Sequence, residues 1–300
     1  MRREQTLRGA AGLVVLADGV QAAFAAGAVA TLARSGRRWS HGLGAGLGAQ
    51  VALLALLGEA EEAARRWRRQ GELGCPLLRS CLAAAQERVG AAEGVLVLPD
   101  AWRLGGWLDA QALAEHLAPE AADPGGRLER AGATLAVAVA DLVAGRFEWA
   151  EVHGQPPREA LQRLDAAGRF AGGWAPLRTG SERDHRVLSG GVGAVPPGPL
   201  PGAITWDVVC GFSVPALRRP GAGAAIWDIA QRHAEMSAAA LAAAWGAGGA
   251  RVVAPDEEAL RSAAGRPDAE LEVEYPLPWE RNGELCSLLV RMGEAAAGRA

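Results

Sequence analysis

The chain has 300 residues, half of them hydrophobic, and a formal net charge of −3. That much apolar sequence can form the core of one large α/β domain, so we expect a single domain over residues 1–300 with its core over about residues 12–296. The acidic balance argues against general nucleic-acid binding, which needs a basic face.

The N-terminal region is largely apolar over Ala10–Ala33, where Asp18 and Gln21 interrupt the run. Asp18 alone adds about 2.5–3.5 kcal/mol to the cost of membrane insertion, and no other uncharged apolar run reaches the ~18 residues of a membrane span. We therefore predict a buried strand over Gly12–Ala17, a turn at Asp18 and Gly19, and a helix over Val20–Ala33, without an export signal or a transmembrane segment.

The rest of the chain alternates between helix-like and strand-like segments. Apolar and amphipathic patterns predict helices over Ala49–Leu57, Glu59–Gln70, about Asp109–Leu117, Arg158–Arg169, Ala222–Trp245 and Gly283–Ala297. Strands are predicted over Ala133–Leu142, Arg146–His153, Ile204–Cys210, Ala250–Ala254 and Glu270–Tyr275, and the Gly- and Pro-rich segment Gly172–Gly202 is predicted to be mostly loop. This order predicts an α/β fold with a mostly parallel central sheet and helices on both faces.

The four cysteines are far from any C-x-x-C spacing, which argues against a zinc site. They are Cys75, Cys81, Cys210 and Cys286. We expect free, buried thiols in a reducing compartment, and so a cytoplasmic protein without a metal.

The glycine-rich segment His41–Gly48 has the spacing of a strand-to-helix turn that carries a hydrolase nucleophile. In the G-x-S-x-G motif the serine occupies a strained turn at the start of a helix. Here Gly42–Gly46 reads G-x-G-x-G and centres on Gly44, while a frame two residues later centres on Gly46. Neither register supplies a hydroxyl, and without one no acyl-enzyme can form.

The order of strand, glycine turn, helix, second glycine turn and apolar helix resembles the patatin-like phospholipase family, over approximately Gly12–Ala296. The resemblance implies a three-layer α/β/α fold, and the enzymes of that family are lipid acyl hydrolases with a serine–aspartate dyad. The segments that carry it are Leu16–Val29, Glu59–Trp67, Gly106–Asp109, Ala140–Arg146 and Leu188–Pro196. The last of these is similar to the Asp-Gly-Gly motif of the family.

Carried over residue by residue, the functional positions of the family do not match. The nucleophile falls on Gly44 and the dyad aspartate on Ser189, which has no basicity near pH 7. The oxyanion-loop positions fall on Ala17, Asp18, Gly19 and Gln21, of which only Gly19 matches. An ionised Asp18 at ~4 Å opposes an oxyanion by about 4 kcal/mol, which cancels the ~3–4 kcal/mol that an oxyanion hole supplies.

The resemblance therefore implies a patatin-like pseudoenzyme that binds a lipid, an acyl ligand or a protein partner, without a cofactor, in the cytoplasm or at the periphery of a membrane. A residual pocket is expected around the glycines Gly42, Gly46, Gly190 and Gly191.

The alternative is a divergent serine esterase or phospholipase that uses another serine. Ser40 lies next to His41, but adjacent residues of a strand point to opposite faces. Ser189 lies near Asp184 and His185 in a loop, at a spacing that no common nucleophile motif uses. A third hypothesis is dinucleotide binding at Gly44–Ala49, which matches G-x-G-x-x-A but lacks a clear preceding strand and a following acidic residue at a strand end.

Overall fold

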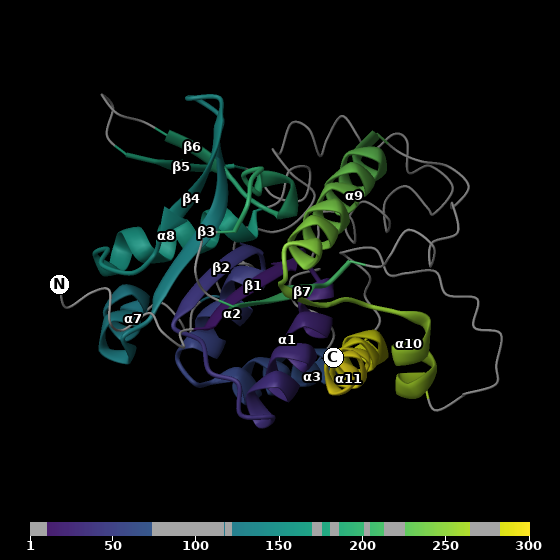
Figure 1. Ribbon diagram of the computed structural model, residues 1–300. Helices are drawn as coiled ribbons and strands as arrows, with labels where there is room; N and C mark the ends of the chain where they lie inside the picture. The colour runs from purple at the N-terminus through teal and green to yellow at the C-terminus, as the bar shows by residue number, and fades with distance from the viewer. Residues whose placement is uncertain are drawn as a thin grey trace.

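The computed structural model describes residues 11–73, 117, 122–169, 176–180, 186–200, 205–212, 226–264 and 283–300. Within them, eight strands form one sheet in the order β5-β6-β3-β2-β1-β7-β8, with β4 paired to β3 (Figure 1). The parallel strands at its centre are β1 (Ala11–Ala17), β2 (His41–Gly46), β3 (Thr134–Asp141), β7 (Thr205–Cys210) and β8 (Arg251–Val253). The remaining strands are β4 (Arg146–Glu151), β5 (Leu177–Thr179) and β6 (Arg186–Ser189), and β4 and β6 run antiparallel to β3.

Helices cover both faces of this sheet. One face of β1, with Leu13 and Val15, packs on α1 (Gln21–Arg34) and α2 (Gly48–Leu56). The opposite face, with Val14 and Leu16, packs on α9 (Ile226–Ala247) and the short helix η4 (Val192–Ala194). The other described helices are α3 (Ala60–Leu73), α7 (Pro124–Ala131), α8 (Pro157–Gly168), α10 (Glu257–Ala264) and α11 (Gly283–Arg299). The predicted α/β fold with a mostly parallel sheet between helices is therefore confirmed.

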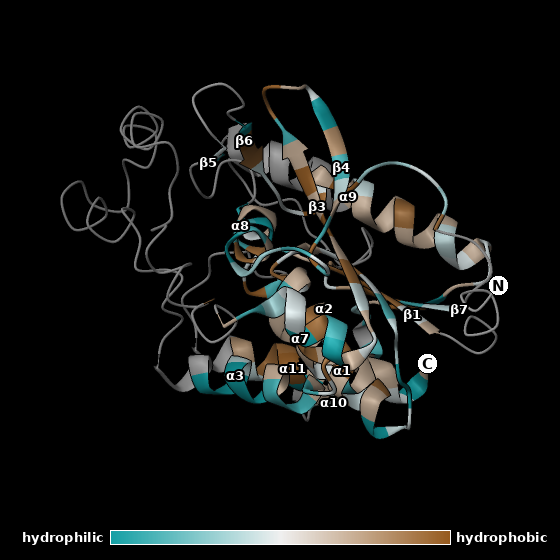
Figure 2. Cartoon of the chain, turned by 90° about the vertical axis from the view of Figure 1, so that its left-hand side faces the viewer, coloured by the Kyte–Doolittle hydropathy of each residue, from teal (hydrophilic) through white to brown (hydrophobic). Residues whose placement is uncertain are grey.

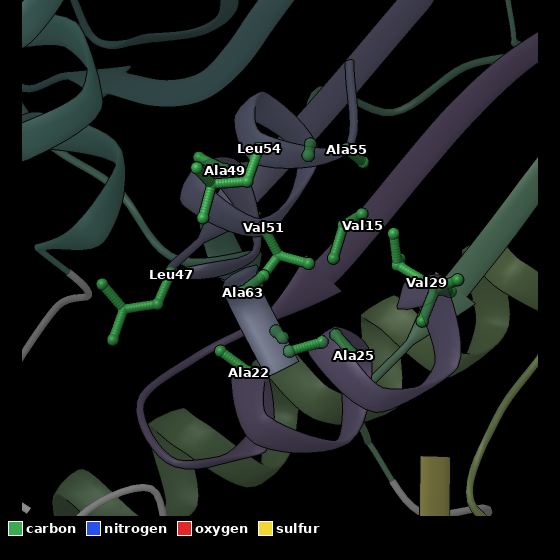
Figure 3. Packing of buried hydrophobic residues seen from close by; sticks show 14 of the residues in the cluster. Val15, Ala22, Ala25, Val29, Leu47, Ala49, Val51, Leu54, Ala55 and Ala63 are labelled. Carbon is green, nitrogen blue, oxygen red and sulfur yellow. The ribbon is translucent and has the colours of Figure 1, made fainter. Parts of the chain in front are cut away.

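The core is continuous around β1 and the helices below it. Figure 3 shows side chains of α1, α2 and α3 gathered near Val15, among them Ala25, Val29, Val51 and Ala63. Nearly every residue of α1 is buried, because α3 and α11 cover the side of this helix that faces away from the sheet (Figure 1). A helix that is mostly apolar around its circumference is typical of a helix inside the fold.

Two glycines allow the backbones of α1 and α11 to touch. A methyl group on Gly27 of α1 would overlap the carbonyl oxygen of Val290, and one on Gly293 of α11 would overlap the carbonyl oxygen of Phe24. The contact is therefore reciprocal, and it holds the last helix of the chain against the first.

The two sides of β3 determine what lies at the end of β2. Ala136 and Val137 pair with both β2 and β4, whereas Ala140 and Asp141 pair with both β6 and β4. Strand β4 therefore occupies one side of β3, and β2 and β6 follow each other along the other side. This arrangement brings the segment after Ser189 to the carboxyl end of β2.

Most predicted elements are found within a few residues of their expected bounds. The described part of the Gly- and Pro-rich segment Gly172–Gly202 also contains the short elements β5, β6 and η4. Neither α7 nor α10 was predicted. The helix predicted to begin at Asp109, the strand predicted over Glu270–Tyr275 and the segment Gly106–Asp109 lie outside the described residues.

Candidate functional site

The turn from β2 into α2 is centred on a glycine with left-handed backbone. Gly46 ends β2 with a φ of +62°, and α2 begins at Gly48. Gly44 lies inside β2, where it pairs with Val15 of β1 and Val137 of β3. The turn therefore follows the second of the two registers, centred on Gly46, whereas Gly44 lies within the strand. Glycine adopts this φ with little strain.

Two of the earlier glycines serve packing. A methyl group on Gly44 would overlap the backbone of Ala49, so this glycine allows the start of α2 to lie directly on β2. A methyl group on Gly42 would lie 2.6 Å from the Leu56 side chain and 3.2 Å from that of Leu135. Apolar side chains of the core thus lie against Gly42, one of the four glycines around which a pocket is expected.

Asp18 follows β1 and points into the turn at Gly46. Its carboxylate is buried and accepts the backbone N–H of Val192, at 3.1 Å and 3.2 Å from its two oxygens. A side chain on Gly46 would begin inside contact distance of Asp18 Oδ1 and of the carbonyl oxygen of Ala17. The space that a side chain at position 46 would need is thus occupied by oxygen atoms from the end of β1.

The electrostatics of this turn are the reverse of those of an oxyanion hole. Such a hole needs N–H donors aimed at the developing negative charge. Here the atoms of the oxyanion-loop positions nearest to Gly46 are a carboxylate and a carbonyl, which both accept hydrogen bonds. The nearby N–H of Val192 is already bound to Asp18.

The neighbouring positions of this loop form the start of α1. Gly19 has a φ of +50°, and the N–H of Gln21 donates to the Asp18 carbonyl over 3.1 Å. Gln21 is fully buried, and a methyl group on Gly211, after β7, would lie 2.9 Å from the Gln21 carbonyl oxygen. A neutral amide is therefore buried at the start of α1.

Ser189 and the two glycines after it are bound to the end of α8. The Ser189 hydroxyl is buried and donates to the carbonyl of Arg169 over 2.9 Å. The N–H of Gly190 donates to the same carbonyl, and that of Gly191 to the Ala167 carbonyl, each over 2.8 Å. These bonds satisfy carbonyls at the end of a helix, which lack partners within the helix.

Of these two glycines, one is needed for packing and one leads to the turn. A methyl group on Gly190 would overlap the Ala166 and Ala167 carbonyls, so the end of α8 lies directly on this residue. Gly191 has a φ of +86° and directs the chain to Val192, next to Asp18. The turn thus brings together Asp18, Gly46 and Gly191 from three separate parts of the sequence.

Ser40 and His41 form a contact that the sequence did not predict. The Ser40 hydroxyl lies 2.9 Å from Nδ1 of His41. Ser40 precedes the first residue of β2, so the alternation of side chains within a strand does not apply to this pair. The pair lies at the amino end of β2, at the opposite edge of the sheet from Gly46. Asp184 and His185, the other expected partners of a serine, lie outside the described residues.

The glycine turn does not favour a dinucleotide. Strand β2 does precede the turn, which corrects the expectation that no strand lies there. A pyrophosphate would bind the free N–H groups at the start of α2, but the Asp18 carboxylate lies against Gly46 and repels a phosphate. Among the described residues, no group of three or more His, Cys, Asp or Glu side chains could hold a metal ion.

A second buried carboxylate, Asp207 of β7, lies toward the amino edge of the sheet. Its Oδ2 accepts the indole N–H of Trp39 over 2.8 Å. Arg37 and Arg251 approach its two oxygens at 4.0 Å and 3.7 Å. The cluster attaches the segment before β2 to β7 and β8. The signal in the sequence that could have predicted this cluster was an aspartate within a mostly apolar strand.

A third carboxylate organises the turn between β3 and β4. Asp141 accepts the N–H groups of Val143 and Ala144 at 3.1 Å each and the guanidinium of Arg186 at 2.8 Å. Burial opposes ionisation of Asp141, but these hydrogen bonds outweigh it and hold its pKa below the ordinary value. The hydrogen bond to Glu148 raises the pKa of Arg186, although burial opposes it.

Neither of the two thiols that the structure describes is part of a disulfide. Cys210 and Cys286 are buried, whereas Cys75 and Cys81 lie outside the described residues. In the part of the chain that the structure describes, no helix is long and apolar enough to cross a bilayer.

Comparison with known proteins adds little to this geometry. No family model matches the sequence, and no curated protein matches it. Among solved structures, VipD from Legionella pneumophila matches 75% of this chain with 12% sequence identity and a TM-score of 0.39. The match covers 52% of VipD, so this chain spans about half the length of that protein.

Proposed function

We propose that this chain is a patatin-like domain that has lost acyl-hydrolase chemistry and works by binding a lipid or acyl ligand, or a protein partner. The observation that carries the proposal is the relation of Asp18 to Gly46. At the strand-to-helix turn, position 46 has no side chain, and the Asp18 carboxylate lies where a nucleophile would be.

Each chemical step of ester hydrolysis lacks its group at this turn. Gly46 offers no oxygen that could form the acyl bond. The Ser189 hydroxyl donates its proton to the Arg169 carbonyl, and a neutral hydroxyl is no base near pH 7. The carboxylate of Asp18 opposes the negative charge of a tetrahedral intermediate. These three losses support a binding role.

The Ser40–His41 contact favours one alternative, a divergent esterase. In that reaction Ser40 Oγ attacks the ester carbonyl, Nδ1 of His41 takes the hydroxyl proton, and the leaving alcohol receives it. Water then cleaves the acyl bond. The distance of 2.9 Å suits the proton transfer. Against it, ligands of open α/β sheets bind outside the carboxyl ends of the strands, and this pair lies at the amino end.

Ester turnover distinguishes the two functions. We expect the purified chain to hydrolyse neither p-nitrophenyl butyrate nor a phosphatidylcholine substrate above the rate of a heat-denatured sample. Turnover that Ser40→Ala abolishes and Ser189→Ala leaves intact would establish the esterase in place of the pseudoenzyme. Turnover that survives both changes would point to another serine and would equally end the proposal.

A further inference from the structure

The turn between β3 and β4 exposes a group of large apolar side chains. Leu142, Val143 and Phe147 are 54%, 56% and 55% exposed. Figure 2 shows this turn as a hydrophobic segment at the end of the hairpin. Single exposed apolar residues are ordinary, but apolar side chains gathered on one surface mark an interaction site. We call these three side chains and Arg146 the hairpin tip.

The hairpin tip extends from the same edge of the sheet as the turn at Gly46. Strands β2 and β3 are parallel, and Gly44 pairs with Val137. After that pair, β2 continues for two residues and β3 for four. Strand β3 is therefore two residues longer at this edge and extends about 7 Å beyond the level of Gly46 before the hairpin turns. The apolar tip therefore projects beyond the carboxyl edge that carries Asp18 and Gly46 (Figure 1).

The charges at the base of the tip are paired with one another, and one arginine of these pairs stays exposed. Arg186 binds both Asp141 and Glu148, and Glu148 also binds Arg146 over 3.1 Å. Both carboxylates are thus paired with arginines, while the Arg146 side chain remains 63% exposed beside the apolar residues. The bonds from Asp141 to the turn N–H groups hold the hairpin in one shape.

This combination suits a lipid bilayer better than a protein surface. A stable protein interface buries about 800 Å² on each partner, which three half-exposed side chains on a convex turn do not provide. A bilayer surface needs no complementary pocket, and it accepts apolar side chains flanked by a cation that contacts anionic headgroups.

We propose that the hairpin tip inserts into the headgroup region of a bilayer that contains anionic lipids, and so brings the carboxyl edge of the sheet to the lipid. The inference rests on the proposed function in one respect, namely that a lipid is the partner of this edge. It does not depend on whether the turn at Gly46 is catalytically silent.

Vesicle flotation tests this inference. Vesicles of phosphatidylcholine alone and of equal parts phosphatidylcholine and phosphatidylglycerol are mixed with the full chain. We expect it to float with the mixed vesicles, and the double variant Leu142→Ser/Phe147→Ser to bind them at least about tenfold more weakly, because both side chains lose apolar contact. Arg146→Gln should lower binding to the mixed vesicles severalfold and leave binding to pure phosphatidylcholine unchanged.

Met236→Ser is the matched control. This side chain is 63% exposed on α9, away from the hairpin, so the change should leave flotation unaltered. The inference is overturned if the wild-type chain stays unbound with both kinds of vesicle, or if the double variant floats as well as the wild type. A dimer in light scattering that the double variant abolishes, without vesicle binding, would assign the tip to a second copy instead. Ester turnover would end the proposed function and leave these results untouched.

Discussion

The carboxylate of Asp18 accepts the backbone N–H of Val192, at 3.1 Å and 3.2 Å from its two oxygens, and so joins the end of β1 to the segment after β6. The two residues are 174 positions apart in the sequence. Their bond holds the carboxylate of Asp18 against Gly46 and occupies the N–H of Val192. In the proposed function, the missing side chain at position 46 and the carboxylate beside it are thus parts of one arrangement.

Removing this carboxylate should destabilise the fold. Asp18→Ala leaves the N–H of Val192 buried without its partner, which costs about 1–3 kcal/mol of the free energy of unfolding. Asp18→Asn keeps an acceptor oxygen of the same shape and should lose less. Urea denaturation followed by circular dichroism measures both. If Asp18→Ala is as stable as the wild type, the bond has no structural role.

Adding a side chain at Gly46 should lower the free energy of unfolding by more than the left-handed backbone of this residue alone explains. Gly46→Ser places a side chain against Asp18 and Ala17, at a φ of +62°. Gly132→Ser is the control, since Gly132 has a φ of +65° and nothing within 4 Å of an added methyl group. Both variants should lose about 1–2 kcal/mol of the free energy of unfolding, because serine disfavours the left-handed backbone.

The difference between the two variants therefore reports the contact with the oxygens. We expect Gly46→Ser to be less stable than Gly132→Ser by a further ~1–3 kcal/mol in urea denaturation. Adding Asp18→Gly to Gly46→Ser removes one of the two contacts and should recover part of that loss. The recovery should be incomplete, because the Ala17 carbonyl still lies against the added side chain. Equal losses at positions 46 and 132 would mean that the turn has free space.

The contact between α1 and α11 should tolerate no added methyl group. Gly27→Ala and Gly293→Ala each force two helix backbones apart and should lose about 1–3 kcal/mol or more. Gly298→Ala, in the same helix α11 with nothing within 4 Å, should be neutral or slightly stabilising, because alanine favours a helix. Thermal unfolding compares the three. A Gly27→Ala variant as stable as Gly298→Ala would show that the helices adjust without cost.

The stability that Asp141 contributes should depend on pH in a defined direction. Its pKa is lower in the folded chain than in the unfolded chain, where an aspartate titrates near about 3.9. The contribution is therefore complete above that pH and is lost as the pH falls through the lower, folded value. Asp141→Asn should be less stable than the wild type at neutral pH, and the difference should shrink as the solution is acidified below about pH 4.

Urea denaturation at a series of pH values measures this difference. Glu129→Gln, a change at an exposed position of α7, serves as the control and should follow the wild type at every pH. A gap between Asp141→Asn and the wild type that grows on acidification would contradict the assigned pKa direction.

The sequence predicts the elements whose signals are local. The apolar run over Gly12–Ala17 and the tight link at Ala144 and Gly145 suffice for β1 and for the hairpin of β3 and β4. The glycine register was missed because G-x-G-x-G repeats every two residues. Which glycine takes the positive φ depends on where β2 ends, and that is decided by its pairing with β1 and β3.

The site contacts join distant residues, and so have no local signal. Nothing near Asp18 in the sequence indicates Val192, and nothing near Ser189 indicates that its hydroxyl binds the Arg169 carbonyl. The Ser40–His41 contact was missed for a different reason, because the alternation rule was applied to a residue that precedes the strand.

A fluorophosphonate probe followed by intact mass measurement tests the absence of a nucleophile most directly. The probe bonds covalently to an activated serine whatever the substrate of the enzyme, so no ligand needs to be known. We expect the purified chain to keep its unmodified mass, while a serine hydrolase treated in parallel gains one probe. Stoichiometric labelling of this chain, at Ser40 or at any other serine, would contradict the view that its acyl-hydrolase chemistry is lost.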